Sequence, residues 1–95
     1  MEITKTIDKN SATFTLQGWL DTQTVSEFES ALNELPEEIE NLTINCQDLE
    51  YISSAGVRQI VAAHKKMSNL TLKNVSNEIM GVFKLTGIDK RLNIS

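Results

Sequence analysis

The chain is poor in cysteine, in clustered basic residues and in long apolar runs, and each of these absences argues against a class of proteins. It has one cysteine, Cys46, so no disulfide can form within it, and we expect a reducing, cytoplasmic location. It carries 9 Lys and Arg against 13 Asp and Glu, without a groove-sized basic patch, so we do not expect nucleic acid as a partner. No apolar run approaches the roughly 20 residues that span a bilayer, and residues 1–5 lack the features of an export signal, so membrane insertion is not expected.

The side chains that build most catalytic and metal centres are also scarce. With one histidine, His64, and one cysteine, neither a Ser-His-Asp triad nor a zinc site can be assembled. Asp21 and Asp48 are not spaced as an acid/base pair. His64 lies on the apolar stripe of a predicted helix, where we expect a partly buried, hydrogen-bonded histidine. Cys46 lies on the apolar side of a predicted strand and is expected to be an inert core thiol. The sequence therefore predicts no metal, no cofactor and no enzyme.

Hydrophobic periodicity predicts one α/β domain over residues 1–95. Alternation of apolar and polar residues predicts strands over 3–7, 14–16, 42–46, 70–72 and 92–94, the third of them ended by Asp48. The turn residues 8–11 join the first two strands into a hairpin. Apolar stripes that begin at Phe28, Val57 and Ile79 predict three helices, of which the first ends at Pro36 and the last at Gly87.

The predicted element order is β-β-α-β-α-β-α-β. Strands joined through helices are usually parallel, and these strands alternate instead of reading as continuous apolar runs. We therefore expect a small mixed sheet with the helices packed mainly on one face and the other face partly wet. Thr24 followed by Glu27 predicts a capping box on the first helix. Asp21 is expected to cap that helix or the loop before it, and Asp48 to fix the turn after the third strand.

Two hydroxyl groups lie where the second helix is predicted to begin, within the run Tyr51–Arg58. The first turn of a helix has unpaired N–H groups and the positive end of the helix dipole. One of Ser53 and Ser54 can be a plain cap, worth about 1 kcal/mol, with Gly56 allowing close packing in the first turn. A hydroxyl there can equally carry a phosphate. The residues alone leave both interpretations open.

Trp19, the only tryptophan, falls on the polar side of its predicted strand, beside Asp21. It is either an exposed anchor for a partner protein, as tryptophan often is in interfaces, or is tucked into a local cluster because the strand ends or bulges at Gly18.

Several features occur together in this sequence: the element order, the run Leu16-x-Gly18-x-Leu20-Asp21, Asp48, the turn Ile52-Ser53-Ser54-Ala55-Gly56-Val57, and residues 82–90. This combination resembles the STAS domain, the fold of bacterial anti-sigma-factor antagonists. With Gly56 fixed, the resemblance implies that Ser54 matches the phosphorylated hydroxyl of that family. Ala55 then matches its small residue and Val57 its aliphatic residue. Ser53 stands where the family usually has Asp, which leaves Ser53 as a second candidate acceptor.

The resemblance implies a non-enzymatic switch. The unmodified chain would bind an anti-sigma factor that is also a serine kinase, phosphorylation of Ser54 would weaken that binding, and a phosphatase would reset it. The expected binding surface comprises Trp19, Asp21, Ser53, Ser54, Ala55, Gly56, Val57 and Arg58. The free chain is expected to be a monomer or a weak dimer. The alternative is a constitutive STAS subunit that binds an ABC-transporter ATPase without phosphorylation. A hydrolase that uses Ser54 is disfavoured because no base accompanies it.

Overall fold

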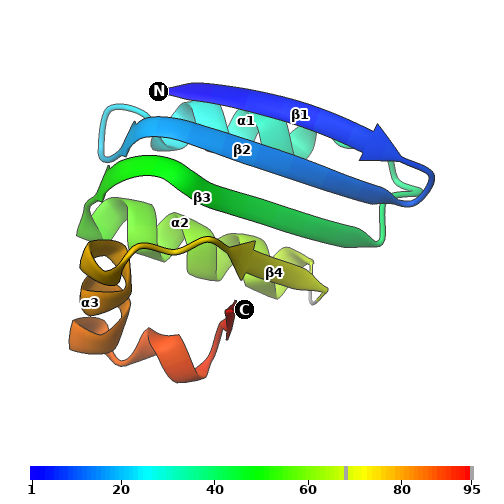
Figure 1. Cartoon of the computed structure of the whole chain (residues 1–95). Coiled ribbons are helices and arrows are strands. Elements are labelled where there is room, and N and C mark those ends of the chain that lie inside the picture. The colour runs from blue at the N-terminus through cyan, green and yellow to red at the C-terminus, as the bar shows by residue number, and fades with distance from the viewer. Residues whose placement is uncertain (68, 95) are drawn as a thin grey trace.

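Five strands form one mixed sheet in the computed structural model, which describes residues 1–67 and 69–94. β1 pairs antiparallel with β2, and the pairs β2/β3, β3/β4 and β4/β5 are parallel, as Figure 1 shows for the four larger strands. The predicted hairpin and mixed sheet are confirmed. The strands are β1 (Glu2–Asp8), β2 (Ser11–Leu20), β3 (Asn41–Ile52), β4 (Leu70–Lys73) and β5 (Asn93–Ile94).

The helices α1 (Val25–Asn33) and α2 (Ser54–Lys66) cover one face of this sheet (Figure 1), as the sequence predicted. α3 (Asn77–Thr86) lies at one end of the sheet and is followed by a short 3₁₀ turn, η1 (Ile88–Lys90). Gly87 closes α3 in the left-handed conformation, with φ of 76°. α1 ends before Leu35 and Pro36, because proline disfavours helical geometry in the residue before it.

The covered face of the sheet holds the core. Its strands bury Phe14, Ile44 and Leu72, and the ring of Phe14 meets that of Phe28 on α1 edge-to-face, with centroids 6.0 Å apart. The opposite face carries partly exposed threonines such as Thr13 and Thr43, so it is partly wet as expected. Alternation along the strands therefore decides which face the helices cover.

β3 extends further than the sequence predicted. Asp48 does not end it, because the strand continues to Ile52. The pairing of β2 with β3 shifts register between Thr15 and Gln17 and again between Gly18 and Trp19, with an extra residue on β3 each time. These bulges break the period of two after Cys46, which is why the second half of the strand was missed. The outcome aligns Leu20 with Ile52.

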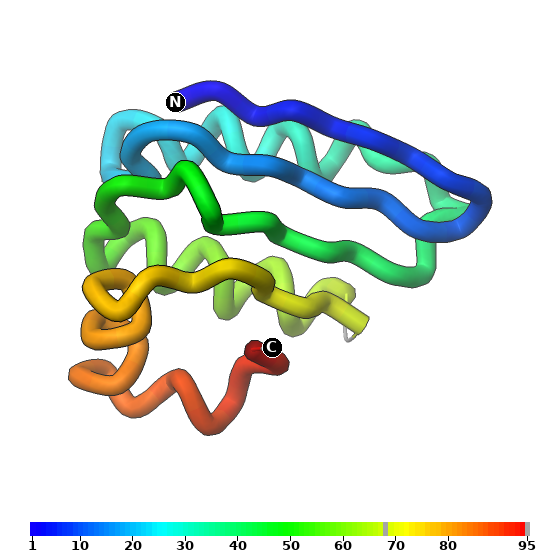
Figure 2. Tube along the Cα trace, viewed as in Figure 1, coloured from blue at the N-terminus to red at the C-terminus, as the bar shows by residue number. Residues whose placement is uncertain are grey.

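The carboxyl ends of β2 and β3 lie at the same end of the sheet, where both α1 and α2 begin (Figure 2). This is a consequence of their parallel pairing. The loop after β2 and the start of α2 are therefore neighbours, although some 30 residues separate them in sequence.

Candidate functional site

The start of α2 is packed tightly against the end of β2. The backbone N–H of Ser53 donates to the carbonyl oxygen of Leu20 at 2.9 Å. A Cβ on Gly56 would lie 2.5 Å from that same oxygen and 2.8 Å from Cγ1 of Ile52. No real side chain tolerates such contacts, and the oxygen belongs to the backbone, so it cannot move aside cheaply. Gly56 is therefore what lets the helix begin at this point.

The two serines at this helix start are in different situations. Ser53 is the N-cap residue in extended geometry, and its Oγ accepts a hydrogen bond from the N–H of Gly56 at 3.2 Å. Ser54 is the first residue of α2 and is exposed. Its hydroxyl makes no hydrogen bond to any of the described residues. The capping role thus belongs to Ser53, and the Ser54 hydroxyl remains accessible.

The loop before α1 is ordered by Asp21 and Thr24. One carboxylate oxygen of Asp21 accepts from the N–H of Gln23 at 3.0 Å. The hydroxyl of Thr24 accepts from the N–H of Asp21 at 2.9 Å and donates to the carbonyl of Trp19 at 2.8 Å. Asp21 therefore holds the loop, as expected. The predicted capping box is wrong, because the Thr24 side chain turns back into the loop and makes no hydrogen bond to its own helix.

Trp19 and Tyr51 form an exposed aromatic pair at the ends of the two neighbouring strands. They are paired in register, and their ring centroids lie 5.5 Å apart, with exposed fractions of 56% and 48%. The register shifts at Gly18, which has φ of 103°, but the extra residue lies on β3 and not on the strand of Trp19, and Trp19 is not tucked in. Tyr51 was missed as a site residue. The sequence did contain a signal for Tyr51. The segments Trp19-Leu20-Asp21 and Tyr51-Ile52-Ser53 both have an aromatic, an aliphatic and a polar residue in that order.

The candidate residues fall on two surfaces on either side of the helix start. Trp19, Asp21, Tyr51 and Ser53 line a shallow hollow together with Thr22 and Gln23, which we call the aromatic hollow. Ser54 and Arg58 instead line a groove along α2. Gly56 and Val57 are buried, and Ala55 is half-buried, so these three shape the turn more than they present side chains to a partner.

Comparison with known proteins gives the family of this chain. Residues 2–95 match the STAS domain. The chain belongs to the STAS domain family. No curated protein sequence matches it.

Solved structures show the same fold at low sequence identity. An anti-sigma factor antagonist from Mycobacterium paratuberculosis has a TM-score of 0.85 and 18% identity, over 98% of this chain and 83% of that one. A sulfate transporter family protein from Wolinella succinogenes has a TM-score of 0.78 and 14% identity, over 94% and 76%. The Bacillus cell fate determinant SpoIIAA in its phosphorylated form has a TM-score of 0.67 and 16% identity, over 99% and 91%. At these identities the likeness shows the fold alone.

The sequence also singled out Cys46 and His64 in this STAS chain. Cys46 is buried in the core, as predicted, and burial raises the pKa of its thiol from 9.0 to about 12, so the thiol stays protonated at neutral pH. His64 is half-buried on α2 as expected, but the predicted hydrogen bond is not found within residues 1–67 and 69–94. None of the helices in that part of the chain is both long and apolar enough to cross a membrane.

Proposed function

We propose that this STAS chain is an anti-sigma-factor antagonist. It would act in the cytoplasm as a non-enzymatic switch that binds an anti-sigma factor with serine kinase activity and loses that binding when Ser54 is phosphorylated. A phosphatase would restore the unmodified chain. The observation that carries the proposal is the division of roles at the helix start, where Ser53 accepts the capping hydrogen bond and Ser54 is exposed. The likeness to an antagonist and to phosphorylated SpoIIAA supports it.

Phosphorylation at Ser54 would leave the fold in place. The helix start is held by the bond from Ser53 N to Leu20 O, the Ser53 cap and the packing of Gly56, none of which uses the Ser54 hydroxyl. A phosphate adds about −1.5 to −2 charges at neutral pH, and the positive end of the helix dipole tolerates them. The modification would therefore change the charge of the surface and leave the core unchanged.

The aromatic hollow beside the helix start suits a partner interface. Tryptophan and tyrosine are enriched among the residues that dominate binding energy, and here both rings are exposed and held by neighbouring strands. A charge added beside such a surface needs to cost only about 1.4 kcal/mol to lower affinity tenfold. An interface that spans the hollow and reaches Ser54 would thus respond to phosphorylation without any refolding.

Intact-mass measurement tests the proposal. The chain is incubated with ATP and the serine kinase that binds it in a pull-down from its native host. We expect a gain of one phosphate, which is lost in Ser54→Ala and kept in Ser53→Ala. Ser53→Ala is the matched control because it removes an adjacent hydroxyl from the same turn. An unchanged mass, or loss of the phosphate only in Ser53→Ala, rejects Ser54 as the acceptor.

A second candidate keeps the fold and drops the switch. Ser53 stands where the family usually has an acidic residue, and here its side chain is engaged as the cap. A site without that carboxylate suits a constitutive STAS subunit that binds an ABC-transporter ATPase. A sulfate transporter family protein is among the structural neighbours, so the fold also occurs in proteins linked to transport. Co-purification with such an ATPase, with no mass change after incubation with kinases, would favour this candidate over the switch.

A further inference from the structure

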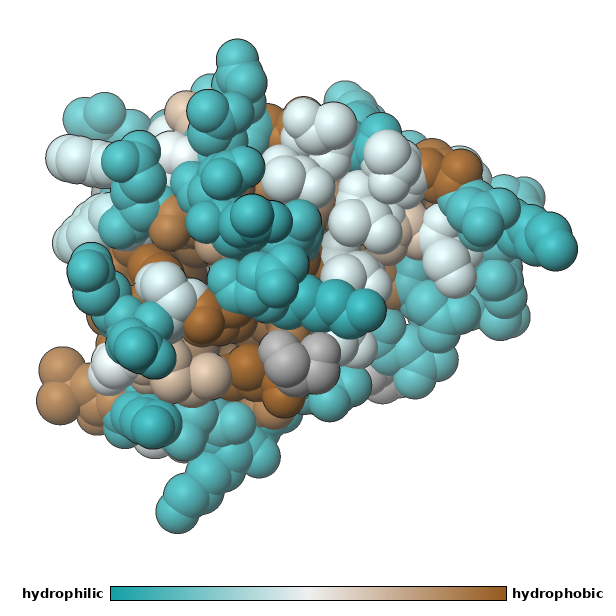
Figure 3. All heavy atoms as spheres, in the orientation of Figure 1, coloured by the Kyte–Doolittle hydropathy of each residue, from teal (hydrophilic) through white to brown (hydrophobic). Residues whose placement is uncertain are grey.

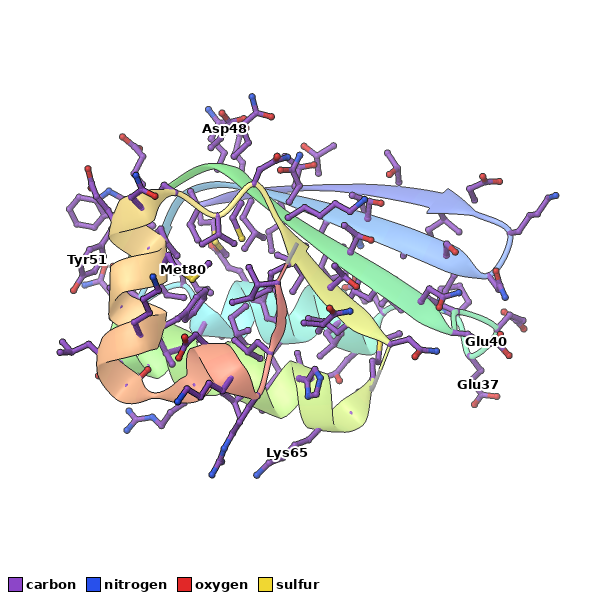
Figure 4. The ribbon with its side chains drawn as sticks, turned by 60° about the horizontal axis from the view of Figure 1, so that its bottom comes forward. Glu37, Glu40, Asp48, Tyr51, Lys65 and Met80 are labelled. Atoms are coloured by element: carbon purple, nitrogen blue, oxygen red, sulfur yellow. The ribbon has the colours of Figure 1, made fainter. Side chains whose placement is uncertain are left out.

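A groove of about 420 Å³ runs between α2 and the segment that begins η1. Its floor is apolar and includes Val57, Val61 and Ile88, while Arg58 and Lys65 stand along it and Ser54 lies at one end. Figure 4 shows η1 alongside α2, with Lys65 projecting outward from the helix. Of the residues that line the groove, the proposed switch uses only Ser54. The switch therefore gives the rest of the groove no function.

The groove is long and follows the helix. Ser54, Arg58, Val61 and Lys65 follow one another at intervals of four, three and four residues, which places them along one side of α2 over three turns. At a rise of 1.5 Å per residue, the stripe extends for about 16 Å. An apolar strip of this length fits an amphipathic segment of a partner protein, as in helix-in-groove recognition.

The charge of the groove selects the partner segment. No carboxylate lines it, and within the described part of the chain neither Arg58 nor Lys65 takes part in an ion pair. This contrasts with the net charge of −4 of the whole chain. Figure 4 shows the acidic residue Asp48 on the far side of the molecule from Lys65. A segment with carboxylates flanking its apolar face would be complementary to the groove.

Apolar surface continues beside the groove. Figure 3 shows apolar side chains gathered at the surface over α3 and toward η1. Leu85, in the last turn of α3, is 89% exposed, and the next residue, Thr86, lines the groove. A partner that fills the groove can therefore also cover Leu85.

We infer that this groove binds an amphipathic, acidic segment of a partner protein, and that Ser54 regulates its binding. The regulatory part rests on the proposed function. A phosphate on Ser54 would put negative charge at the end of the groove, where it repels the carboxylates of the segment. Arg58 is four residues further along the helix, so the phosphate would also compete for its guanidinium. The groove would thus be both the docking site and the part of the surface that phosphorylation closes.

A designed peptide probes the groove without any kinase. The peptide is a stapled helix of about 12 residues, three turns long, with leucines on one face and flanking glutamates. Its control has lysines in place of the glutamates. Titration into ¹⁵N-labelled chain is expected to shift amide signals of residues 54–65 and 86–88, with affinity about tenfold higher for the acidic peptide. Equal affinities, no binding at millimolar concentration, or shifts confined to the aromatic hollow would overturn the inference.

Two adjacent lysines supply a matched pair of variants. Lys65 lines the groove, whereas Nζ of Lys66 donates to Oδ1 of Asn33 on α1 at 2.7 Å. We expect Lys65→Gln and Arg58→Gln each to weaken the acidic peptide about threefold, and Lys66→Gln to leave its affinity unchanged. If Lys65→Gln and Lys66→Gln lose affinity for the peptide equally, the effect comes from the overall charge of the chain, and the groove is rejected as the binding site. Binding of dodecanoate but not of the peptide would make it a site for small amphiphiles instead.

Genetically encoded phosphoserine at position 54 separates this inference from the proposed function. We expect the modified chain to bind the acidic peptide about tenfold more weakly. If kinases leave Ser54 unmodified while the peptide binds as described, the switch fails and the groove stands. If Ser54 is phosphorylated by its kinase while the peptide binds equally well to both forms, the groove is rejected and the switch stands.

Discussion

The inner and outer sides of the α2 start differ in how their residues are held. On the inner side, Ser53 and Gly56 meet the carbonyl of Leu20 and the side chain of Ile52 at close range. On the outer side, Ser54 and Arg58 are exposed and face the groove. Substitution on the inner side must therefore cost stability, whereas modification on the outer side can alter binding alone. A switch that does not refold needs this division within one turn of helix.

Among the substitutions at the helix start, the largest loss of stability is expected at the closest contact. Gly56→Ala would bring a Cβ to 2.5 Å from the oxygen of Leu20, so the helix start must shift. We expect a loss of about 1–3 kcal/mol in the free energy of unfolding, measured by urea denaturation. Gly81→Ala is the control, because nothing lies within 4 Å of its Cβ on the exposed side of α3. It should stabilise the chain by about 0.5–1 kcal/mol. If Gly56→Ala and Gly81→Ala change the free energy of unfolding equally, the close packing at Gly56 does not limit stability.

Cys46 tests, through pH, whether the core that β3 contributes to excludes water. Its folded-state pKa is raised by burial to about 12, above the ordinary 9.0, so the folded chain keeps a proton that the unfolded chain loses. The stability that this contributes is full below pH 9 and is lost as the pH rises from 9 to 12. The slope approaches about 1.4 kcal/mol per pH unit. Unfolding free energies of Cys46→Ala should fall less steeply above pH 9. Parallel curves would show that the thiol is accessible.

The adjacent serines Ser53 and Ser54 allow the stability effects of the inner and outer sides to be compared within one turn of helix. Ser53→Ala removes the hydroxyl that accepts from Gly56 N and should cost about 1 kcal/mol. Ser54→Ala removes an exposed hydroxyl and should change stability by less than about 0.5 kcal/mol. Denaturant midpoints of the two variants, measured side by side, decide this. If Ser54→Ala is the more destabilising of the two, the assignment of cap and acceptor is reversed.

The aromatic hollow is expected to contribute little to stability. Trp19→Ala removes a ring that is more than half exposed, so we expect a loss of about 0.5 kcal/mol together with a clear loss of partner binding. Leu20→Ala is the neighbouring control, since Leu20 is fully buried and its truncation should cost about 2–5 kcal/mol. A thermal melt in which Trp19→Ala is as unstable as Leu20→Ala would show that Trp19 is structural.

Most of the fold followed from alternation and helical spacing, as in β2 with Phe14 and Leu16 buried and the threonines between them partly exposed. The pattern failed where the structure departs from a regular period. The bulges interrupt the alternation in the second half of β3, so that half was not predicted as a strand. The hydroxyl of Thr24 donates to the carbonyl oxygen of Trp19 and does not cap α1, so the predicted capping box is absent. The candidate site was predicted as one surface because sequence places Ser53 and Ser54 side by side. Only the position of the N-cap turns them to different sides.

The groove was not predictable from local sequence. Ser54 and Lys65 lie on α2, but Ile88 comes from a turn more than 20 residues later. Their proximity depends on how the chain after α3 brings η1 alongside α2, which no periodicity records. The aromatic pair is similar, because Trp19 and Tyr51 meet only after two register shifts.

One comparison tests most directly whether a phosphate on the outer side changes partner binding without changing the stability that the inner side provides. The affinity of the serine kinase captured in the pull-down is measured for the unmodified chain and for the chain with phosphoserine at position 54, along with the melting midpoint of each. We expect affinity to fall by about tenfold or more while the midpoint is unchanged. Equal affinities, or a midpoint that falls together with affinity, would contradict a switch that acts through the surface.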